Sequence, residues 1–291
     1  MGGSGDNFHI YPLPLSPPSF RNHRIMTEAT ENPEFCDNCI SGHLKSGKPT
    51  GTIRRLGGLD TYVATPADTE PQAAVLLISD VFGWELVNTR LIADEFAKHG
   101  LLTVVPDLFQ GDALPTDVFL WPSGILAKLA KPFTASYMIG TILLKHGPAS
   151  TNPLIDAVLM DLRSSYLNVE KVGVQGYCWG GKYCGILGAQ PFKVDAISVA
   201  HPAGLSAAEI EAIAVPSLWC CAEYDHMFSA EARKNGEEIL ANRGQIAKFV
   251  MYEGTSHGFA VRCDETDEKA QRAATDALRE AIEFFKRHLL Q

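Results

Sequence analysis

Strand-sized apolar runs alternate with helix-sized segments along most of this chain, and this alternation is the feature that most limits its fold. The run "AAVLLISD" (73–80) is apolar almost throughout, which is typical of a strand buried on both faces. Five similar runs follow at 101–108, 169–176, 194–202, 215–225 and 246–254. Because each is separated from the next by enough residues for a helix, the pattern predicts an α/β domain with a mostly parallel sheet and helices on both faces.

The two ends of this pattern contain elements of other kinds. "TIRRL" and "LDTYVAT" flank Gly57 and Gly58 and predict an antiparallel hairpin. A helix after the first buried run is expected to end at Gly100. A last helix, from about Asp267, has an apolar stripe formed by Ala274, Leu278, Ala281, Ile282, Phe285 and Leu289. This last helix is expected to pack on the sheet.

Three regions differ in organisation. Residues 1–30 begin with a segment rich in Gly, Pro and Ser that lacks helical periodicity, so we expect a disordered extension there. Residues 31–291 are predicted to form a single domain. Within it, 109–153 contains several prolines among short helical pieces and is predicted to form a partial, lid-like excursion over a site.

Charge and cysteine content narrow the class of partner. The chain of 291 residues has 25 Lys and Arg against 34 Asp and Glu, a formal charge of −9, and no basic stripe. This argues against nucleic acid and anionic membranes as partners and favours a small-molecule substrate. Seven scattered cysteines and no apolar run of membrane-spanning length favour a cytoplasmic protein without disulfides. A monomer or a homodimer is expected.

The stretch "GYCWGGKYC" (176–184) is compatible with two kinds of site. Gly176 to Lys182 match the start of a phosphate-binding loop, but Tyr183 stands where that loop needs Ser or Thr to bind magnesium. The alternative is the sharp strand-to-helix turn that exposes a nucleophile, here Cys178, and it requires small residues such as Gly176 and Gly180. The second interpretation is favoured, since a buried strand precedes the turn and a helix follows it.

Two further residues follow in the order that such a nucleophile requires. Asp225 comes at the end of the run 215–225, and His257 comes just after the next run. Taken singly, Asp225 is a candidate helix N-cap and His257 a candidate loop histidine. Together with Cys178 they predict a catalytic triad, in which Asp225 orients His257 and His257 moves the proton. The backbone N–H groups of Trp179 and Val81 are the predicted oxyanion donors.

These motifs, "GYCWGG", "CAEYD", "SHGFAVR" and "SDVFGW", resemble the dienelactone hydrolase family in its fungal and eukaryotic carboxymethylenebutenolidase-like branch. The resemblance covers about residue 36 to the C-terminus. It implies an α/β-hydrolase fold, no cofactor, and hydrolysis of an ester or lactone through a covalent thioester on Cys178. It also implies that an acidic residue after the first buried strand helps to activate the thiol.

Asp80 occupies that acidic position, and the alternative is that it forms a salt bridge to an arginine. The bacterial prototype of the family holds the substrate carboxylate with two arginines. Arg262 lies close to one expected position, whereas the other arginine is absent from "FQGDALP". A more apolar pocket is therefore expected, with contributions from Trp84, Phe109, Trp121 and Phe259. His201, at the end of the run 194–202, is a further candidate pocket residue.

One more cluster, Cys36, Cys39 and His43, is reminiscent of a metal site. Three ligands without a partner cluster are insufficient for a structural zinc, and no metal is expected. The alternatives to an ester or lactone hydrolase are a catalytically silent relative that binds a small molecule or protein partner, and a nucleotide hydrolase that depends on Lys182.

Overall fold

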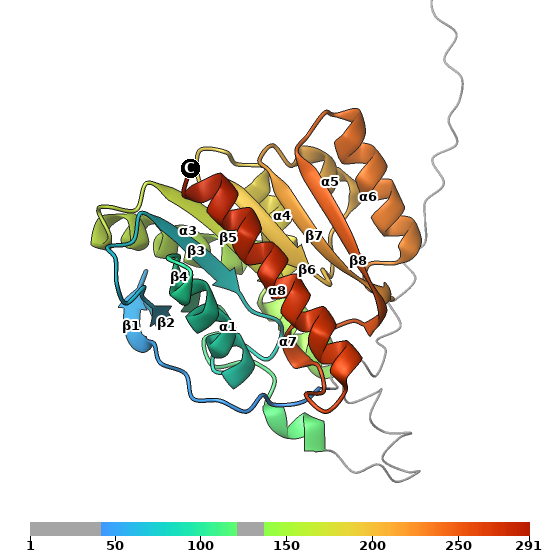
Figure 1. The fold of residues 1–291 in the computed structure, drawn as a ribbon, viewed down its shortest axis with the longest axis horizontal. Helices are drawn as coiled ribbons and strands as arrows, with labels where there is room; N and C mark the ends of the chain where they lie inside the picture. The colour runs from blue at the N-terminus through green and yellow to red at the C-terminus, as the bar shows by residue number, and fades with distance from the viewer. Residues whose placement is uncertain (1–41, 121–136) are drawn as a thin grey trace, which may run out of the picture. The chain divides into compact units, whose positions relative to one another are not determined.

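The computed structural model describes residues 42–120 and 137–291. Its centre is one eight-stranded sheet with helices on both faces (Figure 1). The expectations for residues 1–30 and for Cys36, Cys39 and Trp121 lie outside the described residues. In order across the sheet, the strands are β1 (Thr52–Leu56), β2 (Leu59–Ala64), β4 (Leu102–Pro106), β3 (Ala73–Ile78), β5 (Lys171–Tyr177), β6 (Ala196–Ala200), β7 (Ser217–Tyr224) and β8 (Ala247–Ser256).

Strand direction follows the predicted pattern. The strands β4, β3, β5, β6, β7 and β8 are parallel, whereas β1 and β2 form the antiparallel hairpin and β2 pairs antiparallel with β4. The hairpin turn has Gly57 at φ +59° and Gly58 at φ +81°, backbone conformations that glycine adopts without strain. Every residue of β3, β4 and β6 is buried, as expected for central parallel strands.

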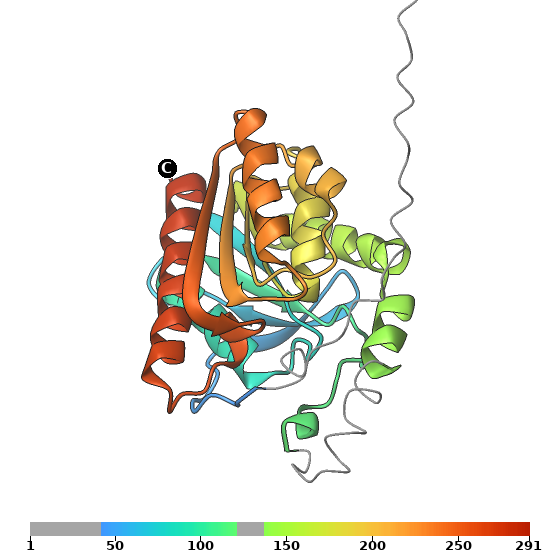
Figure 2. The ribbon, with the colours of Figure 1, turned by 90° about the vertical axis from the view of Figure 1, so that its right-hand side faces the viewer.

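Helices cover both faces of the sheet (Figure 2). One face carries α1 (Val87–Lys98) and α8 (Glu268–Leu289), which meet where Phe96 contacts Phe285 edge to face at 5.9 Å between ring centroids. The other carries α3 (Pro148–Ser165), α4 (Trp179–Gly188), α5 (Ala207–Ala212) and α6 (Ala230–Asn242). Two short elements, the 3₁₀ helix η2 (Thr116–Leu120) and α7 (Phe259–Arg262), lie in connections.

The last helix begins and packs largely as predicted. Asp267 caps α8, because its carboxylate accepts the backbone N–H groups of Lys269 and Ala270. The predicted stripe is buried except for Leu278, which is partly exposed, and Ala277 and Phe284 are buried beside it. None of the helices in the described ranges is long and apolar enough to cross a membrane.

The segment 109–153 is partly helical where it is described. Residues 137–145 form a helix, and α3 begins at Pro148, inside the predicted excursion. Pro148 occupies the first turn of α3. Proline lacks a backbone N–H, and at this position a backbone N–H would have no acceptor within the helix. Pro153 lies within the same helix.

Candidate active site

Cys178 lies at the sharp turn between β5 and α4, with φ +51° and ψ −113°, a conformation that non-glycine residues rarely adopt. The neighbouring glycines make this turn possible. A Cβ at Gly176 would stand 2.5 Å from the carbonyl oxygen of Gly180, and a Cβ at Gly180 would stand 2.2 Å from that of Ile78. The sequence requirement for small residues on both sides of the nucleophile therefore has a direct steric cause.

Backbone hydrogen bonds hold the turn in place. The N–H of Cys178 donates to the carbonyl of Ala200 at 3.2 Å, and the N–H of Ala203 donates to the carbonyl of Cys178 at 2.9 Å. Trp179 is the first residue of α4, so its own N–H has no acceptor within the helix. The loop after β6 thus supports the strained turn, and the Trp179 amide is available to a ligand on the side of the thiol.

Asp225 follows β7 and His257 follows β8, and the two side chains are in contact. His257 Nδ1 lies 2.9 Å from Asp225 Oδ1 and 3.0 Å from Asp225 Oδ2, and both side chains are buried. The Oδ1 atom also accepts the backbone N–H groups of Met227, at 2.8 Å, and Phe228, at 3.1 Å. These bonds fix the carboxylate so that it faces Nδ1 of the imidazole.

The other ring nitrogen of His257, Nε2, is buried and has no hydrogen-bond partner among the described residues. Burial acts to lower the pKa of His257. The negative charge of Cys178 and the hydrogen bond and charge of Asp225 act in the opposite direction and raise this pKa to about 10. The imidazole is therefore set up to hold a proton between a carboxylate and a thiol.

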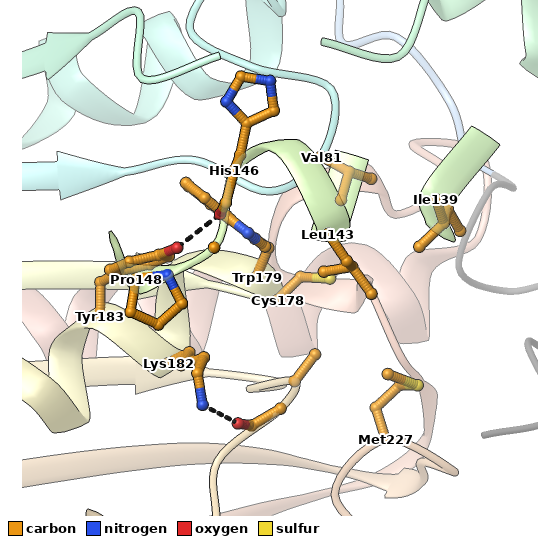
Figure 3. Close-up of a pocket in the computed structure, with 13 residues that line it drawn as sticks. Val81, Ile139, Leu143, His146, Pro148, Cys178, Trp179, Lys182, Tyr183 and Met227 are labelled. Carbon is orange, nitrogen blue, oxygen red and sulfur yellow. Dashed lines mark hydrogen bonds between the residues drawn. The ribbon is translucent and has the colours of Figure 1, made fainter. Parts of the chain in front are cut away.

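A cavity of about 300 Å³ opens beside Cys178 (Figure 3). Figure 3 shows the side chains of Val81, Leu143 and Cys178 gathered around the same space. Among the described residues, those that line it are Val81, Ile139, Leu143, His146, Gly147, Pro148, Cys178, Trp179, Lys182, Tyr183, Ala203, Gly204 and Met227. The nucleophile candidate thus shares one cavity with both residues predicted to donate to an oxyanion, and with residues of the 109–153 excursion.

Asp80 and Arg262 form a buried ion pair, in which Arg262 donates to Asp80 Oδ2. Oδ1 of Asp80 accepts the N–H of Phe82 at 3.0 Å. No hydrogen bond joins Asp80 to Cys178 in the part of the chain that the structure describes. Of the two interpretations of Asp80, the salt bridge to an arginine is the one present here.

Three other predicted pocket residues do not line the Cys178 cavity. Trp84 lines a separate depression, and the guanidinium of Arg90 lies 4.6 Å from its ring centroid. Phe259 lines another depression, together with Arg262. His201 is fully buried against His257, at 5.0 Å between ring centroids. Each of these side chains contacts residues of other elements, and none of the three lines the cavity beside the thiol.

His201 has further unusual features. Its φ is +38°, and neither ring nitrogen has a hydrogen-bond partner among the described residues. Burial and then the positive charges of His257 and Arg262 hold the pKa of His201 well below its usual value. His201 is therefore a neutral ring packed against His257.

Sequence reasoning did not identify several residues of the cavity wall. Ile139 and Leu143 lie four residues apart in the helix 137–145, a spacing that puts them on one helical face. Met227 comes two residues after Asp225 and carries no chemical motif. Phe109 packs on Trp179 at 4.4 Å between ring centroids, behind the cavity wall. A search for apolar i, i+4 pairs within 109–153 would have found Ile139 and Leu143.

Two alternatives from the sequence can be compared with these contacts. Lys182 donates to Glu209 Oε1 at 2.7 Å and to the carbonyl of Gly204 at 2.8 Å, so it is engaged away from a phosphate site. His43 is exposed, with Nε2 at 3.6 Å from Asp264. Across 42–120 and 137–291, no group of three or more His, Cys, Asp or Glu is arranged to hold a metal.

Comparison with known proteins places these features in a family. The family model described as "Dienelactone hydrolase family" matches residues 59–289. The chain is 34% identical to hydrolase pyvD of Aspergillus violaceofuscus, over 86% of this chain and 96% of the relative. It is 27% identical to the human carboxymethylenebutenolidase homolog, over 86% and 96% of the two chains.

Solved structures agree on the fold. The dienelactone hydrolase of Anabaena variabilis superposes with a TM-score of 0.58 at 16% identity, covering 83% of this chain and 98% of that one. This confirms the α/β-hydrolase fold predicted from the sequence. The family model covers the chain from the start of β2 to the end of α8 and includes the turn at Cys178. The chain is therefore a hydrolase that belongs to the dienelactone hydrolase family.

Proposed function

We propose that this protein hydrolyses carboxylic esters or lactones through a covalent thioester on Cys178. The observation that carries the proposal is the buried Asp225–His257 pair, which leaves Nε2 of His257 without a partner among the described residues while Cys178 raises the pKa of the same ring. A histidine fixed by a carboxylate on one side and coupled to a thiol on the other is the arrangement of an activated nucleophile.

The reaction would proceed in two halves. In the first, His257 holds the proton of the Cys178 thiol on Nε2, and the thiolate Sγ bonds to the carbonyl carbon of the substrate. The C–O bond to the alcohol then breaks, the alcohol oxygen receives the proton from His257, and an acyl thioester remains. In the second, His257 removes a proton from water, the hydroxide attacks the thioester, and the carboxylic acid leaves as Sγ recovers its proton.

Both halves develop negative charge on the carbonyl oxygen. The N–H of Trp179, at the start of α4, and the N–H of Val81, after β3, are the proposed donors to it, since both residues line the cavity with Cys178. Asp80 would act on the thiol only after its ion pair with Arg262 opens. In this proposal, Asp225 and His257 are the residues that activate Cys178, while Asp80 stays paired with Arg262.

The test is covalent trapping. Purified protein is mixed with p-nitrophenyl butyrate, quenched in acid and digested, and the peptide that contains Cys178 is examined by mass spectrometry. We expect a butyryl adduct on Cys178, and hydrolysis that is lost in Cys178→Ala. The matched control is Cys184→Ala, because Cys184 lies on the same helix but its thiol is fully buried and faces the carbonyl of Val174.

Hydrolysis at the wild-type rate by Cys178→Ala would exclude a covalent thioester on this residue. A catalytically silent relative that only binds ligands predicts neither adduct nor turnover from folded protein. Either result refutes the proposed function.

A further inference from the structure

We propose that the Cys178 cavity accepts an uncharged, apolar acyl group, so that its substrates are neutral esters or lactones rather than esters that carry a carboxylate on the acyl side. This inference rests on the proposed function and adds the substrate class. It follows from the cavity wall, from the contacts of its polar groups, and from the position of Arg262.

The cavity wall is formed mainly by carbon. Aliphatic side chains and two aromatic rings make up most of it: Val81, Ile139, Leu143, Pro148, Ala203, Met227, Trp179 and Tyr183. A volume of about 300 Å³ is at the lower end for small-molecule sites. At about 30 Å³ per non-hydrogen atom, the volume of a water molecule in the liquid, it holds about ten such atoms. The wall and the volume suit a short or medium apolar chain or one ring.

The polar side chains of the wall are engaged elsewhere. Lys182 bonds to Glu209 and to a carbonyl, and the hydroxyl of Tyr183 donates to the carbonyl of His146 at 2.7 Å. The imidazole of His146 extends away from Cys178 in Figure 3, and its Nε2 lies 3.2 Å from Asp112 Oδ2. Among the described residues that line the cavity, none presents a cation that is not already paired.

Arg262, the residue placed by resemblance near a carboxylate-binding arginine, does not line this cavity. It is 4% exposed, pairs with Asp80, and belongs to the wall of a different depression. A carboxylate brought against the buried part of the wall, beside Val81 or Tyr183, would lose hydration without gaining a counter-ion. Burial of an unpaired charge is strongly unfavourable, so the cavity discriminates against such substrates.

The position of His257 assigns the apolar cavity to the acyl side of the substrate. The leaving alcohol must take its proton from His257, so the alcohol part extends toward that ring. His257 does not line the Cys178 cavity and instead borders another depression. The substituent that fills the apolar cavity is therefore the one that stays bonded to the carbonyl carbon after the alcohol leaves.

The first test varies the acyl group with a constant leaving group. For p-nitrophenyl acetate, butyrate and hexanoate, we expect kcat/KM to rise about fourfold for each added methylene, the effect of burying one CH₂. Replacing the terminal methyl of the hexanoate by a carboxylate, in mono-p-nitrophenyl adipate, should lower kcat/KM on the order of 100-fold or more. The primary amide of the same adipate ester is polar but uncharged. Comparison of its kcat/KM with that of the carboxylate therefore separates the effect of charge from the effect of polarity.

The second test introduces a cation into the cavity wall. In Leu143→Lys the ammonium group would face the cavity, and we expect the rate ratio of the adipate ester to the hexanoate ester to rise at least tenfold. Leu144→Lys is the matched control. Leu144 is the next residue of the same helix, is 88% exposed and does not line the cavity, so its substitution should leave the ratio unchanged.

A wild-type protein that hydrolyses the adipate and hexanoate esters equally well would overturn the substrate class, provided that Cys178 is acylated. Equal effects of Leu143→Lys and Leu144→Lys on the ratio would overturn the location of the acyl group. Absence of any Cys178 adduct with every ester refutes the proposed function itself, so the two failures are distinguishable.

Discussion

Two substitutions at Asp225 separate the proposed catalytic role of this carboxylate from its structural role. Oδ1 accepts two backbone N–H groups, from Met227 and Phe228, while both oxygens face His257 Nδ1. Asparagine keeps one oxygen for the backbone bonds but loses the negative charge. Alanine removes both the negative charge and the two acceptor oxygens. Comparison of Asp225→Asn with Asp225→Ala therefore shows which contacts matter for activity and which for stability.

The magnitudes follow from the number and kind of bonds. A hydrogen bond to a charged group contributes about 1.5–3 kcal/mol, which corresponds to a loss of about 10- to 150-fold in rate when it is removed. Asparagine would also present an N–H to Nδ1 of His257 and place the ring proton on Nε2, where it blocks transfer from the thiol. We therefore expect kcat/KM to fall more than about 100-fold in both variants.

Stability should respond differently. Asp225→Ala loses the two backbone bonds to a charged oxygen, at about 1.5–3 kcal/mol each, so its free energy of unfolding should fall by about 3–6 kcal/mol. Asp225→Asn should lose about half as much, because its neutral amide oxygen can still accept both N–H groups. The assays are kcat/KM with p-nitrophenyl butyrate and urea unfolding at the same pH. If Asp225→Asn stays within tenfold of wild-type activity, the assignment of Asp225 as the orienting acid is refuted.

Two further predictions concern His257 and the turn. Because the pKa of His257 is raised from 6.5 to about 10, its charged form stabilises the fold fully below pH 6.5, and this contribution is lost as pH rises toward 10. In Cys178→Ala the loss of this stabilisation, measured by urea unfolding at several pH values, should occur at lower pH than in the wild type. An identical pH dependence of stability in the wild type and Cys178→Ala would contradict the effect of Cys178 on the pKa of His257. Gly180→Ala should lower stability by about 1–3 kcal/mol and abolish acylation, since its Cβ would meet the Ile78 carbonyl oxygen. Gly140→Ala is the control, because nothing lies within 4 Å of its added Cβ. In thermal unfolding of the two variants, the melting temperature of Gly140→Ala should not fall below that of the wild type.

The fold was predictable from the sequence because its signals are local. Each buried strand is an apolar run, and the strained turn is marked by Gly176 and Gly180, whose Cβ positions are blocked by backbone atoms. The order of Cys178, Asp225 and His257 also followed from strand ends, since parallel strands bring their carboxyl ends to one edge of the sheet. In such a fold, chain order and spatial proximity are closely linked.

The cavity wall was harder to predict, because it depends on how side chains pack between distant segments. Trp84 and Phe259 are adjacent in sequence to site elements, yet their rings pack into other depressions. Ile139 and Leu143 lie in one of the short helical pieces predicted within 109–153, but the sequence of that piece does not say which of its faces borders the cavity. Nearness to a motif along the chain therefore fixes the backbone position of a residue but leaves the direction of its side chain open.

The ion pair of Asp80 and Arg262 shows how such long-range contacts connect the parts of the site. Asp80 directly precedes Val81, a proposed oxyanion donor, and Arg262 lies on α7, just after the loop that carries His257. The bond between the two side chains therefore ties the loop after β3 to the loop after β8. Because breaking a buried pair leaves an uncompensated charge, neither side chain is easily released to another partner. The contact that joins the loop of the proposed oxyanion donor, Val81, to the loop of His257 is thus the same contact that withholds Arg262 from a substrate carboxylate.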